Sequence, residues 1–187
     1  VRALEQAIPI ARELGEPRLF GLVAASYGFA EFARNLGKPH AGAVALLEEA
    51  RGRLGEGDSS ERAQVTLQLG IQLWLGETEE QAKELFAEAV AAARRIGNET
   101  ILLDALFHSA FALWRPEDHG RRLALAEEML ELAERSGSTD KIVLARNQRF
   151  HHFFGQGDFE ACRREDAAIR ELASRTQNAR AMYWYHL

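Results

Sequence analysis

The sequence predicts an all-α fold: an antiparallel helix-pair solenoid whose repeat has a period near 40 residues and whose stack curves into a superhelix. Chain-breaking residues recur in two offset series, with steps of 40, 42 and 40 residues in the first and 39, 40 and 39 in the second. The first series is Gly15, Gly55, Gly97 and Gly137, and the second is Gly37, Gly76, Pro116 and Gly155. About 15 to 20 residues with a helical apolar pattern separate successive breaks, which is typical of repeats made of two helices each. The composition agrees, because the strong helix formers Ala, Leu, Glu and Arg are abundant and the chain has only 4 prolines.

The breaks predict nine helices, with a tenth that begins near Asn178. The expected ranges are 1–14, 17–36, 39–54, 60–75, 79–96, 99–114, 119–135, 139–154 and 158–176. No linker or low-complexity segment interrupts them, so we expect a single repeat domain over residues 1–187. Both ends of the chain lack the polar capping helix that closes a natural array, which predicts that this domain is a fragment of a longer protein.

Residues at the helix ends support these boundaries. Pro17 and Pro39 suit the first helical turn, where the missing N–H of proline has no helical partner to lose. Thr78 followed by Gln81 has the pattern of a capping box, and Asp158 and Thr139 are good N-cap residues. The glycines of the first series stand where a helix C-terminus favours a left-handed residue.

Composition and motifs argue against several classes of function. The net charge of −5 argues against a nucleic-acid-binding surface, and no apolar run approaches the ~18 residues that a membrane span needs. A single cysteine, Cys162, and the lack of a signal-peptide pattern indicate a reducing, cytoplasmic location. The sequence has no phosphate-binding glycine loop, nucleophile elbow, His-Glu-x-x-His motif or cysteine pair. We therefore expect no enzymatic activity, no cofactor and no metal site.

Basic doublets recur on the second helices of the pairs, at Arg94-Arg95, Arg121-Arg122 and Arg163-Arg164. Acidic residues stand near each doublet along the chain. The doublets therefore predict a mixed, solvated surface and not a stripe that binds an acidic partner.

The second helices also carry a recurring alanine pattern. Alanine occupies the sixth and thirteenth positions after three of the breaks, with a residue of variable size at the tenth: Ala43, Leu47 and Ala50; Ala82, Phe86 and Ala89; Ala161, Glu165 and Ala168. This pattern resembles the tetratricopeptide repeat, although the period is near 40 and not about 34 residues, and no proline closes the second helix.

Lengthened repeats of this kind resemble the helical C-terminal regions of large bacterial regulators. These are the ATPase-containing LuxR-type transcriptional activators, maltose-activator-like proteins and related ATPase–cyclase fusions. The stretch 113–118, running into 122–128, carries the resemblance most clearly, and the likeness extends over the whole chain. The nucleotide-binding and DNA-binding domains of such regulators are not visible in this sequence, so neither activity is expected of it.

The first helices of the pairs carry the candidate binding residues. In tetratricopeptide-like stacks these helices line the concave side, and a 40-residue alignment places three rows of their side chains on one helical stripe. The rows are Tyr27, Leu67, Phe107 and Asn147; Glu31, Ile71, Phe111 and His151; and Arg34, Trp74, Trp114 and Phe154. Aromatic side chains supply a large contact area, so the stripe predicts a groove that binds a partner segment. Polar members at its ends, Glu31, Arg34, Asn147 and His151, would add specificity.

Packing between helices is the alternative role for this stripe, because Trp and Phe at helical spacing are common in protein cores. The same helices offer another apolar row for packing, Val23, Leu103 and Val143. A further aligned row is small at three of its four positions, as close helix crossing requires: Ala30, Gly70, Ala110 and Phe150.

Together these features predict a non-catalytic protein-interaction or signal-sensing domain of a larger bacterial transcriptional regulator. Its groove would bind a protein or peptide segment and thereby bias an attached output domain. A small-molecule inducer-sensing domain is one alternative. A scaffold or self-association module, which would form homo-oligomers, is another.

Overall fold

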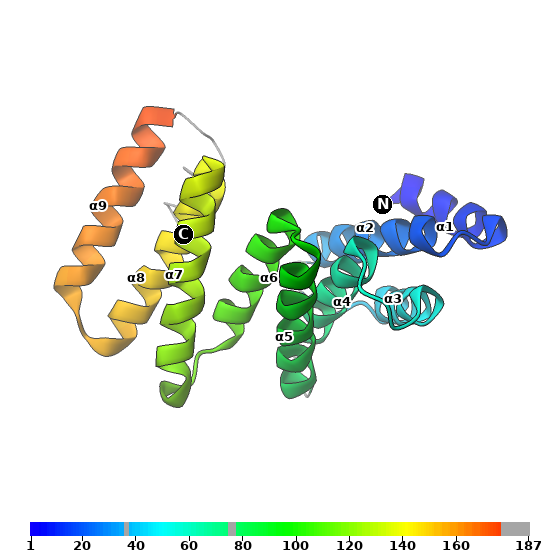
Figure 1. The fold of residues 1–187 in the computed structure, drawn as a ribbon, viewed down its shortest axis with the longest axis horizontal. Helices are drawn as coiled ribbons and strands as arrows, with labels where there is room; N and C mark the ends of the chain where they lie inside the picture. The colour runs from blue at the N-terminus through cyan, green and yellow to red at the C-terminus, as the bar shows by residue number, and fades with distance from the viewer. Residues whose placement is uncertain (36–37, 75–77, 177–187) are drawn as a thin grey trace. The chain divides into compact units, whose positions relative to one another are not determined.

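The computed structural model describes residues 1–35, 38–74 and 78–176, and every regular element within those ranges is a helix (Figure 1). The predicted all-α class is therefore confirmed. The chain divides into two compact units, Val1–Ala105 and Leu106–Leu187, and the division falls within the helix α6 (Glu99–Ala112). We refer to these as the N-terminal unit and the C-terminal unit.

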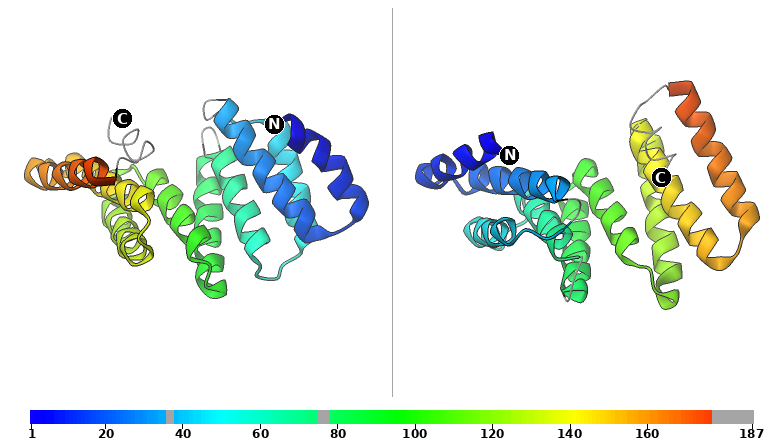
Figure 2. Two further views of the ribbon diagram at one scale, coloured as in Figure 1. Left: turned by 90° about the horizontal axis from the view of Figure 1, so that it is seen from above. Right: turned by 180° about the vertical axis from the view of Figure 1, so that it is seen from behind.

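The N-terminal unit is built from helices that alternate in direction and lie side by side (Figure 2). Its described elements are α1 (Arg2–Leu14), α2 (Pro17–Arg34), α3 (Ala41–Leu54), α4 (Ser60–Leu73), α5 (Glu79–Ile96) and the first part of α6. From α1 to α5 each helix packs against the next one, and α2 also packs directly against α4. Direct contact between the first helices of successive pairs is the arrangement of a helix-pair solenoid, as predicted.

One buried core joins α1 to α5. Its larger members are Phe20 of α2, Leu46 and Leu47 of α3, Val65 and Leu69 of α4, and Leu85 of α5. Val23 packs against this core, and Leu103 of α6 is also buried. Val23 and Leu103, two members of the row predicted for packing between helices, therefore do pack inside the N-terminal unit.

The crossing of α4 and α5 depends on Gly70. A Cβ atom at this position would lie 2.7 Å from Cε1 and 2.8 Å from Cδ1 of Phe86, which is closer than carbon atoms can approach. Phe86 itself is fully buried. The small residue that the period places at position 70 is therefore what lets the Phe86 ring pack against the backbone of α4.

The C-terminal unit begins within α6 and continues through the 3₁₀ turn η1 (Pro116–Asp118). Its remaining described helices are α7 (His119–Ser136), α8 (Thr139–Gln156) and α9 (Phe159–Thr176). Helix α8 packs against both α7 and α9. Val143 of α8 is buried together with Ile169 and Ala173 of α9, so the packing row also holds in this unit.

Several predicted helix ends are confirmed. Pro17 is the first residue of α2, and Asp158 Oδ1 accepts a hydrogen bond from Ala161 N at 2.9 Å at the start of α9. All four glycines of the first series have positive φ, and Gly15, Gly97 and Gly137 adopt the left-handed C-terminal conformation.

Other predicted helix ends are wrong, and one of them is Thr139, which is the first residue of α8 and not its N-cap. Pro39 precedes α3, and the following His40 is the N-cap, because its Nδ1 accepts a hydrogen bond from Ala43 N at 3.2 Å. Thr78 forms no side-chain cap, since its backbone is not extended and its hydroxyl donates instead to the carbonyl of Leu73. Helix α8 runs through Gly155 to Gln156, and Gly157, at a φ of 75°, takes the left-handed position.

The expected breaks at Gly37 and Gly76 and the expected helix near Asn178 lie outside the described residues. The single domain, the superhelical curvature and the origin in a longer protein stay predictions.

Candidate functional site

The three predicted groove residues of α2 form a polar cluster at the C-terminal end of that helix. Glu31 is fully buried, and its Oε2 accepts hydrogen bonds from Arg34 Nη2 at 2.8 Å and from Asn35 Nδ2 at 2.9 Å. Tyr27 packs edge-on against His40, with ring centroids 6.3 Å apart. Of the three predicted residues, only Arg34 is largely exposed. Glu31 therefore anchors its neighbours and offers no surface to a partner.

Hydrogen bonds from Arg34 hold the pKa of Glu31 below its ordinary value of 4.5. A carboxyl group with a lowered folded-state pKa contributes stability above its unfolded-state pKa and loses it as the pH falls through its folded-state pKa. We expect the melting temperature of the wild type to fall in acid, below pH 4.5. Glu31→Gln should be less stable than the wild type at pH 7, but it should lose less stability than the wild type below pH 4.5. Circular dichroism melts from pH 7 to about pH 3 measure both.

The exposed Glu13 of α1 offers a matched control. Glu13→Gln should keep the acid dependence of the wild type. If Glu31→Gln kept it too, the Glu31 cluster would not be a source of acid sensitivity.

Helix α4 supplies the next three predicted residues, and two of them are core residues. Leu67 and Ile71 are buried, so packing between helices is the role that the structure gives them. Trp74, at the C-terminal end of α4, is half-buried. At Leu67 and Ile71, therefore, the stripe that the alignment assigns to a groove is not accessible to a partner.

The C-terminal unit gathers its predicted residues into a continuous row of rings. Successive centroids are 5.6 to 6.2 Å apart along the series Phe107, Phe111, Trp114, His151, Phe150, Phe154 and Phe159, which we call the aromatic row. The row begins on α6, passes through the segment after it, follows α8 and ends at the start of α9. Trp114, Phe154 and Phe159 are 47%, 59% and 57% exposed, and the other four rings are half-buried. Asn147 lies half-buried on α8, one turn before His151.

Two members of the aromatic row are absent from the predicted stripe. Phe150 occupies the aligned row whose other members are small. A large ring at a position where the other repeats have a small residue is the sequence feature that could have identified it. Phe159 directly follows the Asp158 cap, which places its ring beside the end of α8 and next to Phe154.

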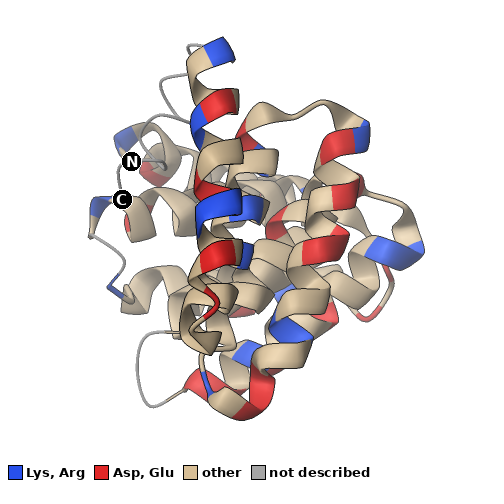
Figure 3. Ribbon diagram, turned by 90° about the vertical axis from the view of Figure 1, so that its left-hand side faces the viewer, with Lys and Arg blue, Asp and Glu red and all other residues tan. Residues whose placement is uncertain are grey.

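Most charges of the molecule are interleaved along the helices, as predicted for a solvated surface (Figure 3). Arg95 of one doublet pairs with Asp58, and Arg164 of another pairs with Glu160. The middle doublet differs from the prediction. The side chain of Arg121 is 72% exposed, whereas Arg122 is only 2% exposed. Adjacent helical residues point about 100° apart, so one member of a doublet can face the interior.

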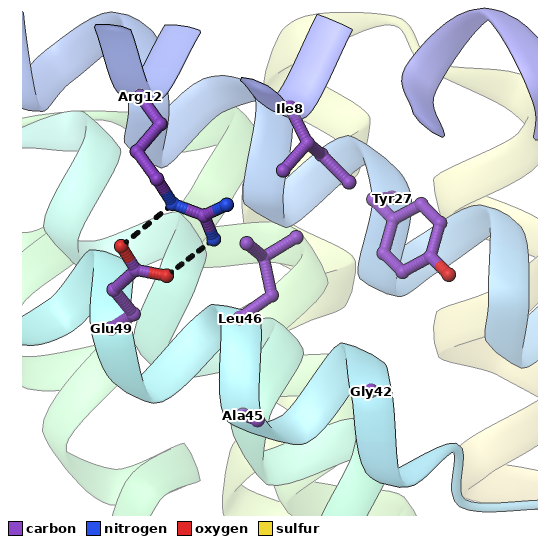
Figure 4. A pocket seen from close by; sticks show the side chains of 7 residues that line it. All are labelled: Ile8, Arg12, Tyr27, Gly42, Ala45, Leu46 and Glu49. Carbon is purple, nitrogen blue, oxygen red and sulfur yellow. Dashed lines mark hydrogen bonds and ion pairs between the residues drawn. The ribbon is translucent and has the colours of Figure 1, made fainter. Parts of the chain in front are cut away.

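A pocket of about 270 Å³ lies between α1, α2 and α3 in the N-terminal unit (Figure 4). Its lining residues are Ile8, Arg12, Tyr27, Gly42, Ala45, Leu46 and Glu49. The two charged groups in this lining bind each other, since Arg12 donates to Glu49 through Nε at 3.1 Å and Nη2 at 2.7 Å. The pocket therefore presents no unpaired charge to a ligand.

In comparisons with known proteins, no protein-family model and no curated protein matches this chain. Across residues 1–35, 38–74 and 78–176, no three side chains of His, Cys, Asp or Glu come together in a way that could hold a metal ion. None of the described helices has the length and apolar character needed to cross a lipid bilayer.

Proposed function

We propose that the chain is a non-catalytic binding domain that holds a segment of a partner protein on the aromatic row of its C-terminal unit. The observation that carries this proposal is the continuity of seven rings with three members about half exposed. Scattered single apolar side chains are normal on a protein surface, but a contiguous row of large ones marks an interaction site.

The chemistry of the row favours a protein segment as the occupant. Trp and Phe give a large contact area with few side-chain torsions to immobilise, and interface hot spots are enriched in aromatic residues. Burial, with the charge of Arg122 adding to it, lowers the pKa of His151, so this ring is mostly neutral at pH 7 and fits an apolar row. An elongated row of rings suits a chain with several apolar side chains.

The wider setting is part of the same proposal. A domain of a bacterial transcriptional regulator, in which the bound segment biases an output domain, agrees with the tetratricopeptide-like pattern of the second helices.

Trp114→Ala tests the proposal. Peptides selected from a displayed random library against the wild-type chain would be labelled with fluorescein, and their affinities measured by fluorescence anisotropy. Because Trp114 stands in the middle of the row, its removal should weaken binding by about tenfold or more. Phe154→Ala should also weaken it.

Phe29→Ala is the matched control, because Phe29 is 59% exposed, as Phe154 is, but belongs to the N-terminal unit. It should leave the affinity within about twofold, since exposed residues outside an interface contribute little to binding. Equal losses in Phe29→Ala and Phe154→Ala, or no enriched peptide, would contradict the proposal. Circular dichroism confirms that each variant is folded.

A further inference from the structure

Arg122 is a buried cation without a carboxylate partner. Its one hydrogen bond joins Nη2 to the neutral amide oxygen of Gln148 at a long 3.4 Å, and its Nε has no hydrogen-bond partner. Burial lowers its pKa from the ordinary arginine range to about 10, and no carboxylate acts against that shift. The guanidinium is therefore still charged at neutral pH while it is 2% exposed.

Glu165, in the same unit, shows how a buried charge is normally compensated. It accepts hydrogen bonds from Arg146 Nη1 at 3.1 Å and from Arg149 Nε at 2.8 Å. Arg149 also pairs with Glu127. Arg122, by contrast, has the neutral amide of Gln148 and the face of the Trp114 ring beside it, and no carboxylate. A buried charge without a counter-ion costs free energy even when a cation–π contact offsets part of that cost, and such a cost is typical of functional sites.

The polar groups around Arg122 are short of an acceptor. Gln148 Nε2, a donor, has no hydrogen-bond partner, as is true of Arg122 Nε. His152 of α8 is buried as well, and burial together with the charges of His119 and Arg122 lowers its pKa, so that it adds no competing charge at pH 7. One acceptor with one negative charge would satisfy the free donors of Arg122 and Gln148 and balance the charge of Arg122.

Trp114 covers the guanidinium. The Arg122 Cζ atom lies 4.0 Å from the centre of the Trp114 ring, and this ring is 47% exposed. Trp114 stands between α6 and η1, outside any helix. Rotation of this partly exposed side chain would uncover Arg122.

We propose that Arg122 is the receiving group of a binding site for a small carboxylate, with Gln148 as a second donor and the Trp114 ring as one wall. The Nε and Nη2 atoms share one edge of the guanidinium, and this edge matches the two oxygens of a carboxylate. A monovalent carboxylate balances one buried positive charge. Inorganic phosphate at pH 7 is a mixture of monoanion and dianion, and the dianion would leave excess negative charge buried.

The test uses the whole chain and three sodium salts at equal ionic strength and pH 7: acetate, chloride and phosphate. The Nε–H resonance of Arg122 in the ¹⁵N-labelled protein reports directly on the unpartnered donor. Acetate should shift this resonance in a saturable manner, chloride should not, and phosphate should bind more weakly than acetate because only its monoanion matches the single buried charge. Absence of saturation with acetate, or tighter binding of phosphate, would overturn the proposal.

Acetate that binds the folded chain should raise the melting temperature of the wild type, and Arg122→Met, which removes the charge, should abolish this stabilisation. Arg121→Met is the matched control, because Arg121 is the exposed neighbour that pairs with Asp118, and it should keep the acetate response within about twofold. Equal responses in Arg122→Met and Arg121→Met would also overturn the proposal. The wild-type titration decides the question even if Arg122→Met does not fold.

Carboxylate binding at Arg122 is a different function from the capture of a protein segment on the aromatic row. Experiment can therefore reject either proposal while the other stands. Failure of the wild-type chain to bind any selected peptide, with a normal acetate titration, would reject only the peptide proposal. The reverse result would reject only the carboxylate site.

Discussion

Phe86→Ala should lower the free energy of unfolding of the N-terminal unit by about 3 to 5 kcal/mol, the usual cost of truncating a fully buried phenylalanine. The ring is 1% exposed and fills the space beside Gly70 at the crossing of α4 and α5. Because the backbone of α4 cannot collapse into that space without moving the whole helix, we expect a cavity to remain. Hydrogen exchange of the amides of α4 and α5 measures the loss within this unit.

Gly70→Ala examines the same contact from the other side. The added methyl group would clash with the Phe86 ring at 2.7 Å, so we expect a net destabilisation of about 1 to 3 kcal/mol. Alanine has the higher helix propensity, by about 1 kcal/mol, and this opposes the clash. In the Phe86→Ala background the clash is gone, so Gly70→Ala should become neutral or stabilising there.

Gly52→Ala provides the control for helix propensity. A Cβ atom at Gly52, near the end of α3, would have open space within 4 Å, and this substitution should stabilise by up to about 1 kcal/mol. A stabilising Gly70→Ala in the wild-type background would contradict the close crossing of α4 and α5.

The helices were predictable from the sequence because their signals are local. Gly97 and Gly137 take the left-handed conformation that ends a helix, and they do so at the predicted period. The ends that failed also have a local cause: His40 has a ring nitrogen able to cap α3, and Gly157 competes with Gly155 for the same role.

The exposure of the candidate binding residues was not predictable, because it depends on which helices meet. Periodicity places Leu67 and Trp74 on one stripe, yet the packing of neighbouring helices buries the first and leaves the second half-exposed. Arg122 is the clearest case. Its sequence neighbours suggest a solvated doublet, and only the structure shows that it is buried beneath Trp114.

Gln72→Leu should destabilise the N-terminal unit by about 2 to 3 kcal/mol, because the buried Gly28 carbonyl and the partly buried His40 N–H would each lose a hydrogen bond. Gln72 is fully buried in α4. Its Nε2 donates to the carbonyl of Gly28 in α2 at 2.7 Å, and its Oε1 accepts from His40 N, at the start of α3, at 3.0 Å. One side chain thus links three helices, and leucine can replace its volume but neither hydrogen bond.

Gln68→Leu separates the hydrogen bonds from the packing. Gln68 is also buried in α4, but its Oε1 has no hydrogen-bond partner, so removing the amide should be neutral or stabilising. Urea denaturation of both variants, followed by hydrogen exchange of α2 and α4, provides the comparison. Similar losses in the two variants would mean that α4 simply tolerates leucine poorly. A loss confined to Gln72→Leu would locate the stability in the bonds to Gly28 and His40, because both substitutions exchange a buried glutamine for leucine on the same helix.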